Sequence, residues 1–274
     1  MIKRNQHVIP RCYLKHFKNN EGLVYAYNVI GERFLKTNIN HVCSHKDAYE
    51  TFDKIDNILE NDIAMIEENL SPYLDDLIFK ALNGNLKRED IDNHKLFKYI
   101  MLLQLRTDSN RILFTRALFG YEGMDHHMNI DELKENEIFL RLFNVKFKQK
   151  GALNSTLDDW YKKTKPEIRI GITKKDRFIT SDNPVVLFYI PNETDYVAIK
   201  HVLPICPNVC IYFFGLDKIG ISKEKQVNFP YMIENDTVQG YNQAIIKAAN
   251  FWIVSSNPFN VIQQQGLFQR FKKK

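Results

Sequence analysis

The hydrophobic pattern of this chain changes its period near Pro166. Before that residue, apolar side chains recur at helical spacing, and after it they form short alternating or continuous runs bounded by turn residues. Helices repeat every 3.6 residues and strands every two, so helices should dominate the first half and strands the second. This segregation favours an α+β fold, with a mainly antiparallel sheet in the C-terminal half, over an alternating α/β fold.

Helices account for most of the first half. One apolar stripe predicts a helix over residues 53–82, and a second long helix should run from about residue 87 to Gly120, with a buried middle at 96–105. Shorter helices are expected at 132–147 and 157–163. An N-terminal β-hairpin should precede them, with strands at 23–27 and 34–36 around a turn at Gly31-Glu32.

Strands account for most of the second half. The ranges expected to form them are 167–173, 177–180, 185–190, 196–203, 209–215 and 251–255, with a last helix at 236–249. We expect a single domain over residues 1–274, made of a helix-rich part (1–165), a strand-rich part (166–256) and a basic C-terminal tail (257–274).

Composition limits the class of protein. With 274 residues and 44% hydrophobic content the chain is able to bury a real core. Its four cysteines contain no C-x-x-C pair and should be reduced, and no signal peptide or membrane-length apolar run is visible. We therefore expect a cytoplasmic protein with no membrane partner. The net charge of +5 is compatible with nucleic acid, although a terminal lysine run is more often a solvated tail.

Four motifs in order carry a resemblance to a known family. They are His7-x-x-Pro10-x-x-Tyr13-Leu14-x-x-Phe17, Leu23-Val-Tyr-Ala-Tyr27, Gln104-x-Arg106-Thr107 and Phe178-Ile-Thr-Ser-Asp182-Asn183-Pro184-Val185. Together they resemble a large uncharacterised prokaryotic family of domains of unknown function. Cys206 stands where relatives tend to have Ser. The resemblance implies candidate positions and no transferable activity.

His7 and Tyr13 are the first candidates. A histidine near neutral pH acts as acid, base or ligand, and Pro10 fixes an extended path that would position it. The alternative is that His7 and Tyr13 only anchor the N-terminus by hydrogen bonds to the backbone.

A second set of candidates lies on the two long predicted helices. Glu67 falls at the margin of the first apolar stripe, where it needs a partner or reaches water. Gln104, Thr107 and Arg111 share the apolar face of the second helix, and Arg111 would suit a carboxylate or phosphate. Arg106 falls on another face as a surface residue, although the family resemblance includes it. The alternative is a structural network in which Arg111 pairs with Glu67 or Asp182.

Asp182 and Asn183 precede Pro184 at the end of a predicted strand. Catalytic carboxylates emerge at such turns, but Asp and Asn also close turns for purely structural reasons.

His41, Cys43, His45 and Asp47 alternate and would share one face of a strand. They lack the second ligand pair of a zinc signature, so no metal ligands are assigned. A divalent metal bound by carboxylates elsewhere is compatible with the sequence.

Two hypotheses follow from these residues. In the first, the chain is a hydrolase of phosphate-containing or other anionic substrates, nuclease-like, with a toxin or defence role. His7, Glu67 and Asp182 would be its acids and bases, and Gln104, Arg106, Thr107, Arg111, Tyr13 and Asn183 would bind substrate. In the second, the chain is a non-catalytic nucleic-acid- or protein-binding or sensor module, and the same polar residues only hold its halves together.

Overall fold

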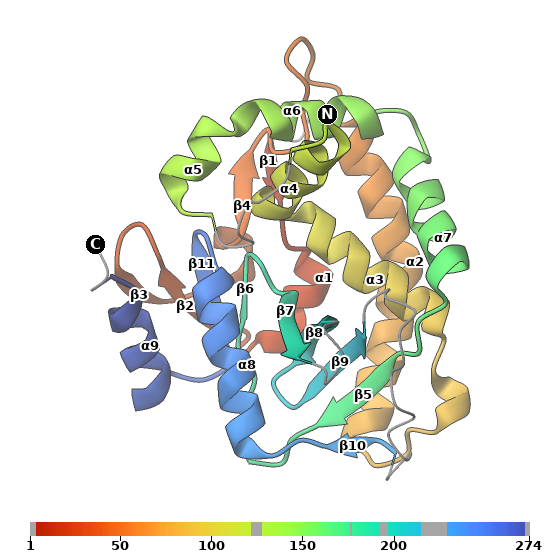
Figure 1. Cartoon of the computed structure of the whole chain (residues 1–274). Helices are drawn as coiled ribbons and strands as arrows, with labels where there is room; N and C mark the ends of the chain where they lie inside the picture. Colours follow the sequence, from red (N-terminus) through yellow and green to blue (C-terminus); the bar gives the residue numbers. More distant parts are fainter. Residues whose placement is uncertain (1–3, 122–127, 176, 192–196, 215–228, 272–274) are drawn as a thin grey trace.

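The computed structural model describes residues 4–121, 128–175, 177–191, 197–214 and 229–271 (Figure 1). Its helices are α1 (Arg11–Leu14), α2 (Ile58–Leu82), α3 (Asn93–Arg106), α4 (Asp108–Leu118), α5 (Ile130–Glu135), α6 (Glu137–Phe147), α7 (Ala152–Thr164), α8 (Asn235–Ala248) and α9 (Val261–Phe271). Its strands are β1 (Asn5–His7), β2 (Val24–Asn28), β3 (Arg33–Thr37), β4 (Ser44–Lys46), β5 (Arg169–Ile172), β6 (Thr180–Ser181), β7 (Val186–Pro191), β8 (Val197–Cys206), β9 (Val209–Phe214), β10 (Tyr231–Met232) and β11 (Trp252–Ser255).

The predicted α+β class is confirmed, with most helices in the first half and mainly antiparallel sheets. Of the predicted strand ranges, residues 196 and 215 lie outside the described residues. None of the described helices is long and apolar enough to cross a bilayer.

Helix α2 follows the apolar stripe seen in the sequence. It buries Ile63, Ile66, Leu70, Leu74 and Leu77 on one face, as period 3.6 requires. The helix begins at Ile58 rather than near residue 53, because Asn57 immediately before it adopts a left-handed backbone conformation, with φ at 57°.

The second long helix is in fact two helices, so the prediction of one continuous helix was wrong. Thr107 interrupts it with an extended backbone, at φ −78° and ψ 144°. Its hydroxyl donates to the Gln104 carbonyl, which also accepts from the Thr107 amide at the end of α3. The same hydroxyl accepts from the Asn110 side chain in the first turn of α4. These side-chain bonds stabilise the end of one helix and the start of the next.

The strands form two larger sheets and one small pair. The five-stranded sheet has the order β10-β5-β9-β8-β7, antiparallel except where β10 meets β5, and the four-stranded sheet has the order β3-β2-β11-β6. The predicted hairpin is confirmed as β2–β3, but its other neighbour is β11 from the far end of the chain. The pairing of β1 with β4 was not predicted.

The two largest apolar clusters hold the helices and the sheets together. The larger one packs α2, α3 and α7 against the N-terminal motif, where Tyr13, Leu14 and Phe17 are fully buried. The smaller one lies beneath α8 and includes Phe178, Val238 and Ile253.

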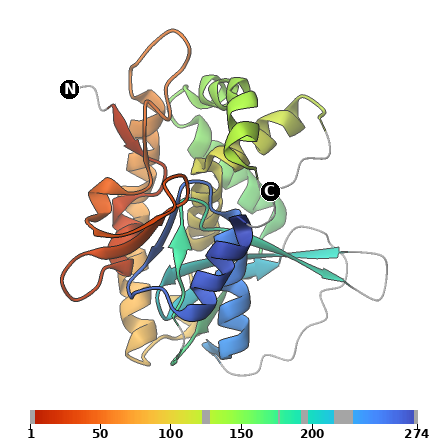
Figure 2. The same ribbon diagram turned by 90° about the vertical axis from the view of Figure 1, so that its left-hand side faces the viewer.

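The C-terminal segment is not simply a basic tail. Residues 261–271 form α9, which lies beside α8 (Figure 2) and buries Leu267 completely. Phe259 and Leu267 give this part of the predicted tail an apolar contact with the rest of the fold. The lysine run at 272–274, which the sequence predicts to be solvated, lies outside the described residues.

Candidate functional site: a buried polar junction between two helices

Polar residues gather where α3 ends and α4 begins. Arg106 is 2% exposed and Arg111 is 1% exposed, and Thr107, Ser109 and Asn110 between them are also buried. We call residues 104–111 the α3–α4 junction. Burying so many polar groups is unfavourable unless each finds a partner, so their contacts define what the junction does.

Arg106 binds the N-terminal segment to α2. Its Nε donates to the Val8 carbonyl and to the Tyr49 hydroxyl, each at 3.0 Å, and its Nη2 donates to the His7 carbonyl. Its Nη1 forms an ion pair with Glu67, whose side chain is only 14% exposed. The expectation that Arg106 is a surface residue was wrong, because the helix ends at this residue and its side chain points inward.

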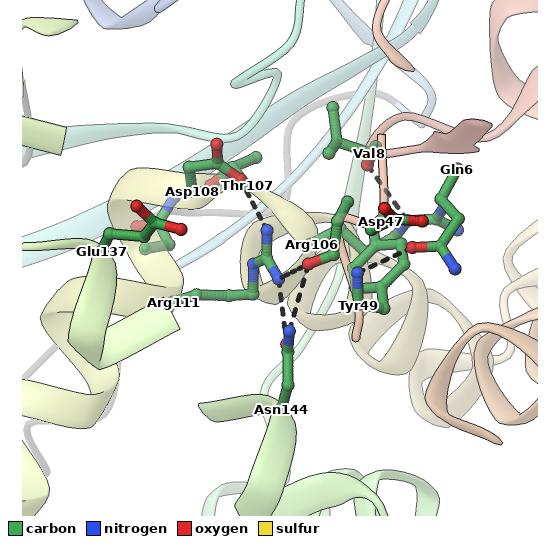
Figure 3. Close-up of polar contacts among 12 residues, drawn as sticks. Gln6, Val8, Asp47, Tyr49, Arg106, Thr107, Asp108, Arg111, Glu137 and Asn144 are labelled. Atoms are coloured by element: carbon green, nitrogen blue, oxygen red, sulfur yellow. Dashed lines mark hydrogen bonds and ion pairs between the residues drawn. The ribbon is translucent and has the colours of Figure 1, made fainter. Parts of the chain in front are cut away.

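Arg111 binds a different set of groups. Its Nη1 donates to the Ala48 carbonyl at 2.7 Å and to Asn144 Oδ1 at 3.1 Å, and its Nη2 pairs with Asp108 at 2.6 Å (Figure 3). The expected pairing of Arg111 with Glu67 or Asp182 is therefore wrong; Arg106 takes Glu67 instead.

The ring of Tyr49 connects the two arginines. The guanidinium carbon lies 5.4 Å from the ring centroid for Arg106 and 4.9 Å for Arg111. Both distances are within the range of cation–π attraction. One aromatic side chain thereby joins the two charged clusters.

Asn183 connects the junction to the β6–β7 turn. Its Oδ1 accepts from Asn110 at 3.1 Å, and its Nδ2 donates to Ser109 Oγ and to the Ala248 carbonyl, each at 3.2 Å. Asn110 also donates to Thr107, so these residues form one buried hydrogen-bonded chain.

Asp182 is buried and bound by the backbone. Its oxygens accept from the amides of Asn250, Phe251 and Trp252 at 3.0, 2.8 and 3.2 Å. Burial raises the pKa of Asp182 to about 6, although these three hydrogen bonds act in the opposite direction. The carboxylate fixes the start of β11.

The His7 ring and the Gln104 amide have unused hydrogen-bonding atoms. Burial lowers the pKa of His7 to about 4, and the positive charges of Arg11 and Arg106 lower it further. Within the described residues, His7 Nε2 and Gln104 Oε1 are buried without a hydrogen-bond partner. Tyr13 differs, because its hydroxyl lies 2.7 Å from Thr180 Oγ1 and donates to the Pro204 carbonyl at 2.6 Å.

The predicted residues therefore fall into linked groups rather than one shared cleft. The His7 carbonyl and Glu67 meet at Arg106, and Thr107 and Asn183 meet through Asn110. Among the described side chains, no hydrogen bond or ion pair joins the His7 ring to Glu67 or Asp182. Their catalytic and substrate-binding roles stay predictions.

Sequence reasoning missed Tyr49, Asp108 and Asn110. The run Thr107-Asp108-Ser109-Asn110 is a helix-start signal in the middle of an apolar pattern, and this signal was available in the sequence. Tyr49 lies in a short loop, where apolar residues do not recur at helical or strand spacing, so no sequence pattern predicted its burial.

The alternating residues from His41 to Asp47 do not share a strand face, contrary to expectation. His41 ends a short 3-10 turn and Cys43 has a φ of 54°, so only Ser44–Lys46 is extended as a strand. Across the part of the chain that the structure describes, no three His, Cys, Asp or Glu side chains are placed to hold a metal.

These features define an α+β protein in which two buried arginines join an N-terminal segment to a helical layer. The model of a family described as "Protein of unknown function (DUF4238)" matches residues 5–259, and the chain belongs to this family. The inferred membership of an uncharacterised family is thereby confirmed. No curated protein and no solved structure matches the chain.

Proposed function

We propose that this protein is a non-catalytic nucleic-acid-binding module whose buried polar junction is structural. The observation that carries the proposal is the distribution of charge. Residues 141–177 contain eleven Lys and Arg against four Asp and Glu, a formal charge of +7, whereas the whole chain carries +5. The rest of the chain is therefore slightly acidic, and the positive charge is local. We call residues 141–177 the basic segment.

The cations of the basic segment are accessible and spread out. Its exposed members are Lys146, Lys150, Lys162, Lys163, Lys165, Lys174, Lys175 and Arg177. Helix α7 alone, with 13 residues, spans about 20 Å, and β5 continues the segment beyond it (Figure 1). Charges spread over this length suit a polymer with regularly spaced phosphates better than one small anion.

The contacts of Asp182 and of the α3–α4 junction support the non-catalytic part of the proposal. Asp182 is held by three backbone amides, and Arg106 and Arg111 by backbone carbonyls and carboxylates of their own chain. Groups bound in this way stabilise a fold and have little capacity left for a substrate.

Binding of a labelled 20-nucleotide single strand tests the proposal. We expect fluorescence anisotropy to show binding that weakens with salt. Replacing Lys162, Lys163 and Lys165 by Gln removes three cations and should lower the slope of log K against log salt by about 2, since each phosphate contact on a single strand contributes about 0.7.

The matched control replaces Lys18, Lys46 and Lys87 by Gln, which changes the net charge equally at exposed residues elsewhere. It should keep most of the wild-type slope. Equal slopes in the two triple variants, or no binding by the wild-type protein at low salt, would sink the proposal.

A second candidate, the nuclease-like hydrolase with a toxin or defence role, is favoured by one observation. His7 Nε2 is buried without a partner among the described residues, close to Arg106, and its lowered pKa of about 4 keeps it neutral and able to accept a proton at pH 7. Electrophoresis of the strand after incubation distinguishes the two. An intact strand supports the binding module; cleavage that His7→Ala abolishes, with the melting temperature unchanged, supports the hydrolase.

A further inference from the structure

A cavity of about 280 Å³ lies among α2, α3 and α7, away from the α3–α4 junction. These three helices pack side by side (Figure 1). Its lining includes Asp62, Met65, Ile66 and Leu70 from α2, Lys98 from α3, and Lys150 just before α7. The volume is slightly below the range of about 300–1,000 Å³ for ligand sites, which suits one small planar group.

Asp62 gives the cavity a hydrogen-bond acceptor. The residue is 3% exposed, and its Oδ1 accepts from the Gly151 amide at 3.0 Å. Its Oδ2 is buried and has no hydrogen-bond partner among the described residues. A buried carboxylate oxygen without a donor is unfavourable, so a ligand that donates a hydrogen bond to Asp62 would stabilise the site.

The other walls supply an apolar surface and a cation. Met65, Ile66 and Leu70 form the apolar side. Lys98 is already held by Asn154 at 2.6 Å and Asp158 at 2.8 Å. Lys150 is exposed, belongs to the basic segment, and has no acidic partner within ion-pair distance among the described residues.

We propose that this cavity holds one guanine base of the bound single strand. The carboxylate of Asp62 accepts hydrogen bonds from guanine N1–H and the 2-amino group, the ring lies against Met65, Ile66 and Leu70, and the phosphate meets Lys150. This inference rests on the proposed nucleic-acid-binding function and names a base preference for it.

The hydrogen-bonding edges of the bases explain the choice. Guanine presents two adjacent N–H donors, which match the two oxygens of a carboxylate. Adenine and cytosine place a ring-nitrogen acceptor beside their amino group, and uracil flanks its single N–H with carbonyl oxygens, so each directs a lone pair at the carboxylate. A site built to accept from two donors rejects a ligand that lacks them.

Calorimetric titration of the full chain with mononucleotides tests the inference. We expect GMP to bind at least tenfold more tightly than AMP, CMP or UMP. Inosine monophosphate, which lacks the 2-amino group, should bind more weakly than GMP. Asp62→Asn keeps an oxygen for Gly151 but turns the free acceptor into a donor, so GMP binding should fall at least tenfold.

Glu68→Gln is the matched control, because it makes the same change at an exposed position of α2 and should leave GMP binding unchanged. If Asp62→Asn fails to fold, Lys150→Ala at the exposed rim replaces it. That variant should bind GMP and guanosine equally, whereas the wild-type protein should prefer GMP.

Equal affinities for GMP and AMP, no binding at millimolar GMP, or wild-type GMP affinity in Asp62→Asn would each overturn the inference. Such a result leaves the proposed function standing if the lysine triple variant still lowers the salt slope of strand binding. If the two lysine triple variants instead show the same salt slope while GMP still binds, the proposed function is wrong and the cavity is a guanine-nucleotide site.

Discussion

The half-buried ring of His7 ties the stability of the protein to pH. Burial lowers its pKa from 6.5 to about 4 in the folded state. Between these values the unfolded chain binds a proton that the folded chain does not, so His7 contributes its full stability above pH 6.5 and loses it as pH falls towards 4. We expect His7→Gln to reduce the fall in unfolding free energy between pH 7.5 and 5 by about 1 kcal/mol, measured by urea unfolding. Over the 1.5 pH units between the unfolded-state pKa of 6.5 and pH 5, a fully buried ring would lose about 2 kcal/mol of stability. The His7 ring is partly exposed, which reduces this loss.

His41→Gln is the control for this prediction, because His41 is exposed. This variant should keep the wild-type pH dependence of stability. His16 has its pKa lowered to about 4 mainly by burial, so part of the pH dependence should persist in His7→Gln. If His7→Gln and wild type lose equal stability on acidification, the ring is not held neutral by the fold.

Single residues could be singled out from the sequence, but not their partners. The helical period alone placed Thr107 and Arg111 on an apolar face and so predicted that they need partners. The groups they bind include the Ala48 carbonyl and the side chains of Asn110 and Asn144. Backbone carbonyls have no sequence signature, and Ala48 is 63 residues away from Arg111. Nothing local in the chain predicts such a pairing.

At the scale of elements, Arg106 is the contact through which the end of α3 holds both β1 and α2. Arg106→Ala would leave the Glu67 carboxylate and the carbonyls of His7 and Val8 without their donor. Removing one partner of a buried ion pair costs about 3–5 kcal/mol, so we expect a loss of this size in the free energy of unfolding. Arg106→Lys should recover part of it, because a lysine keeps the charge but not the fork of donors.

Arg33→Ala, at an exposed position of β3, is the control and should change the free energy of unfolding by no more than about 0.5 kcal/mol. Urea unfolding followed by circular dichroism measures all three variants. An effect of Arg106→Ala as small as that of Arg33→Ala would show that Arg106 does not hold these elements together.

Local hydrophobic patterns predicted those helices and strands well whose pattern is continuous along the sequence. The β2–β3 hairpin and α2 were found because alternation and the apolar stripe are continuous over each. The break at Thr107 was missed because the apolar period continues across it, and the interruption depends on side-chain bonds to Gln104 and Asn110.

The whole molecule is interleaved rather than divided at Pro166. Strand β11, close to the end of the chain, lies between the N-terminal strand β2 and β6 in one sheet, and Asp182 fixes its first residues (Figure 1). The sequence predicted each strand but not this order, since pairing between strands more than 200 residues apart depends on the complete fold. The four-stranded sheet therefore needs strands from both sides of Pro166, although the five-stranded sheet uses only strands that follow it.

This interleaving predicts a single cooperative unfolding transition, which the two tryptophans can test. Trp160 lies on α7 in the helical layer, with its ring centroid 5.7 Å from that of Phe114, and Trp252 lies on β11 in the four-stranded sheet. The variants Trp160→Phe and Trp252→Phe each retain one tryptophan. Each variant's fluorescence should give the same urea midpoint as its own circular dichroism signal, because the helical layer and the sheet unfold together. A fluorescence midpoint at lower urea than the circular dichroism midpoint in one variant would mean that the layer holding the retained tryptophan unfolds independently. The single-domain interpretation would then have to be abandoned.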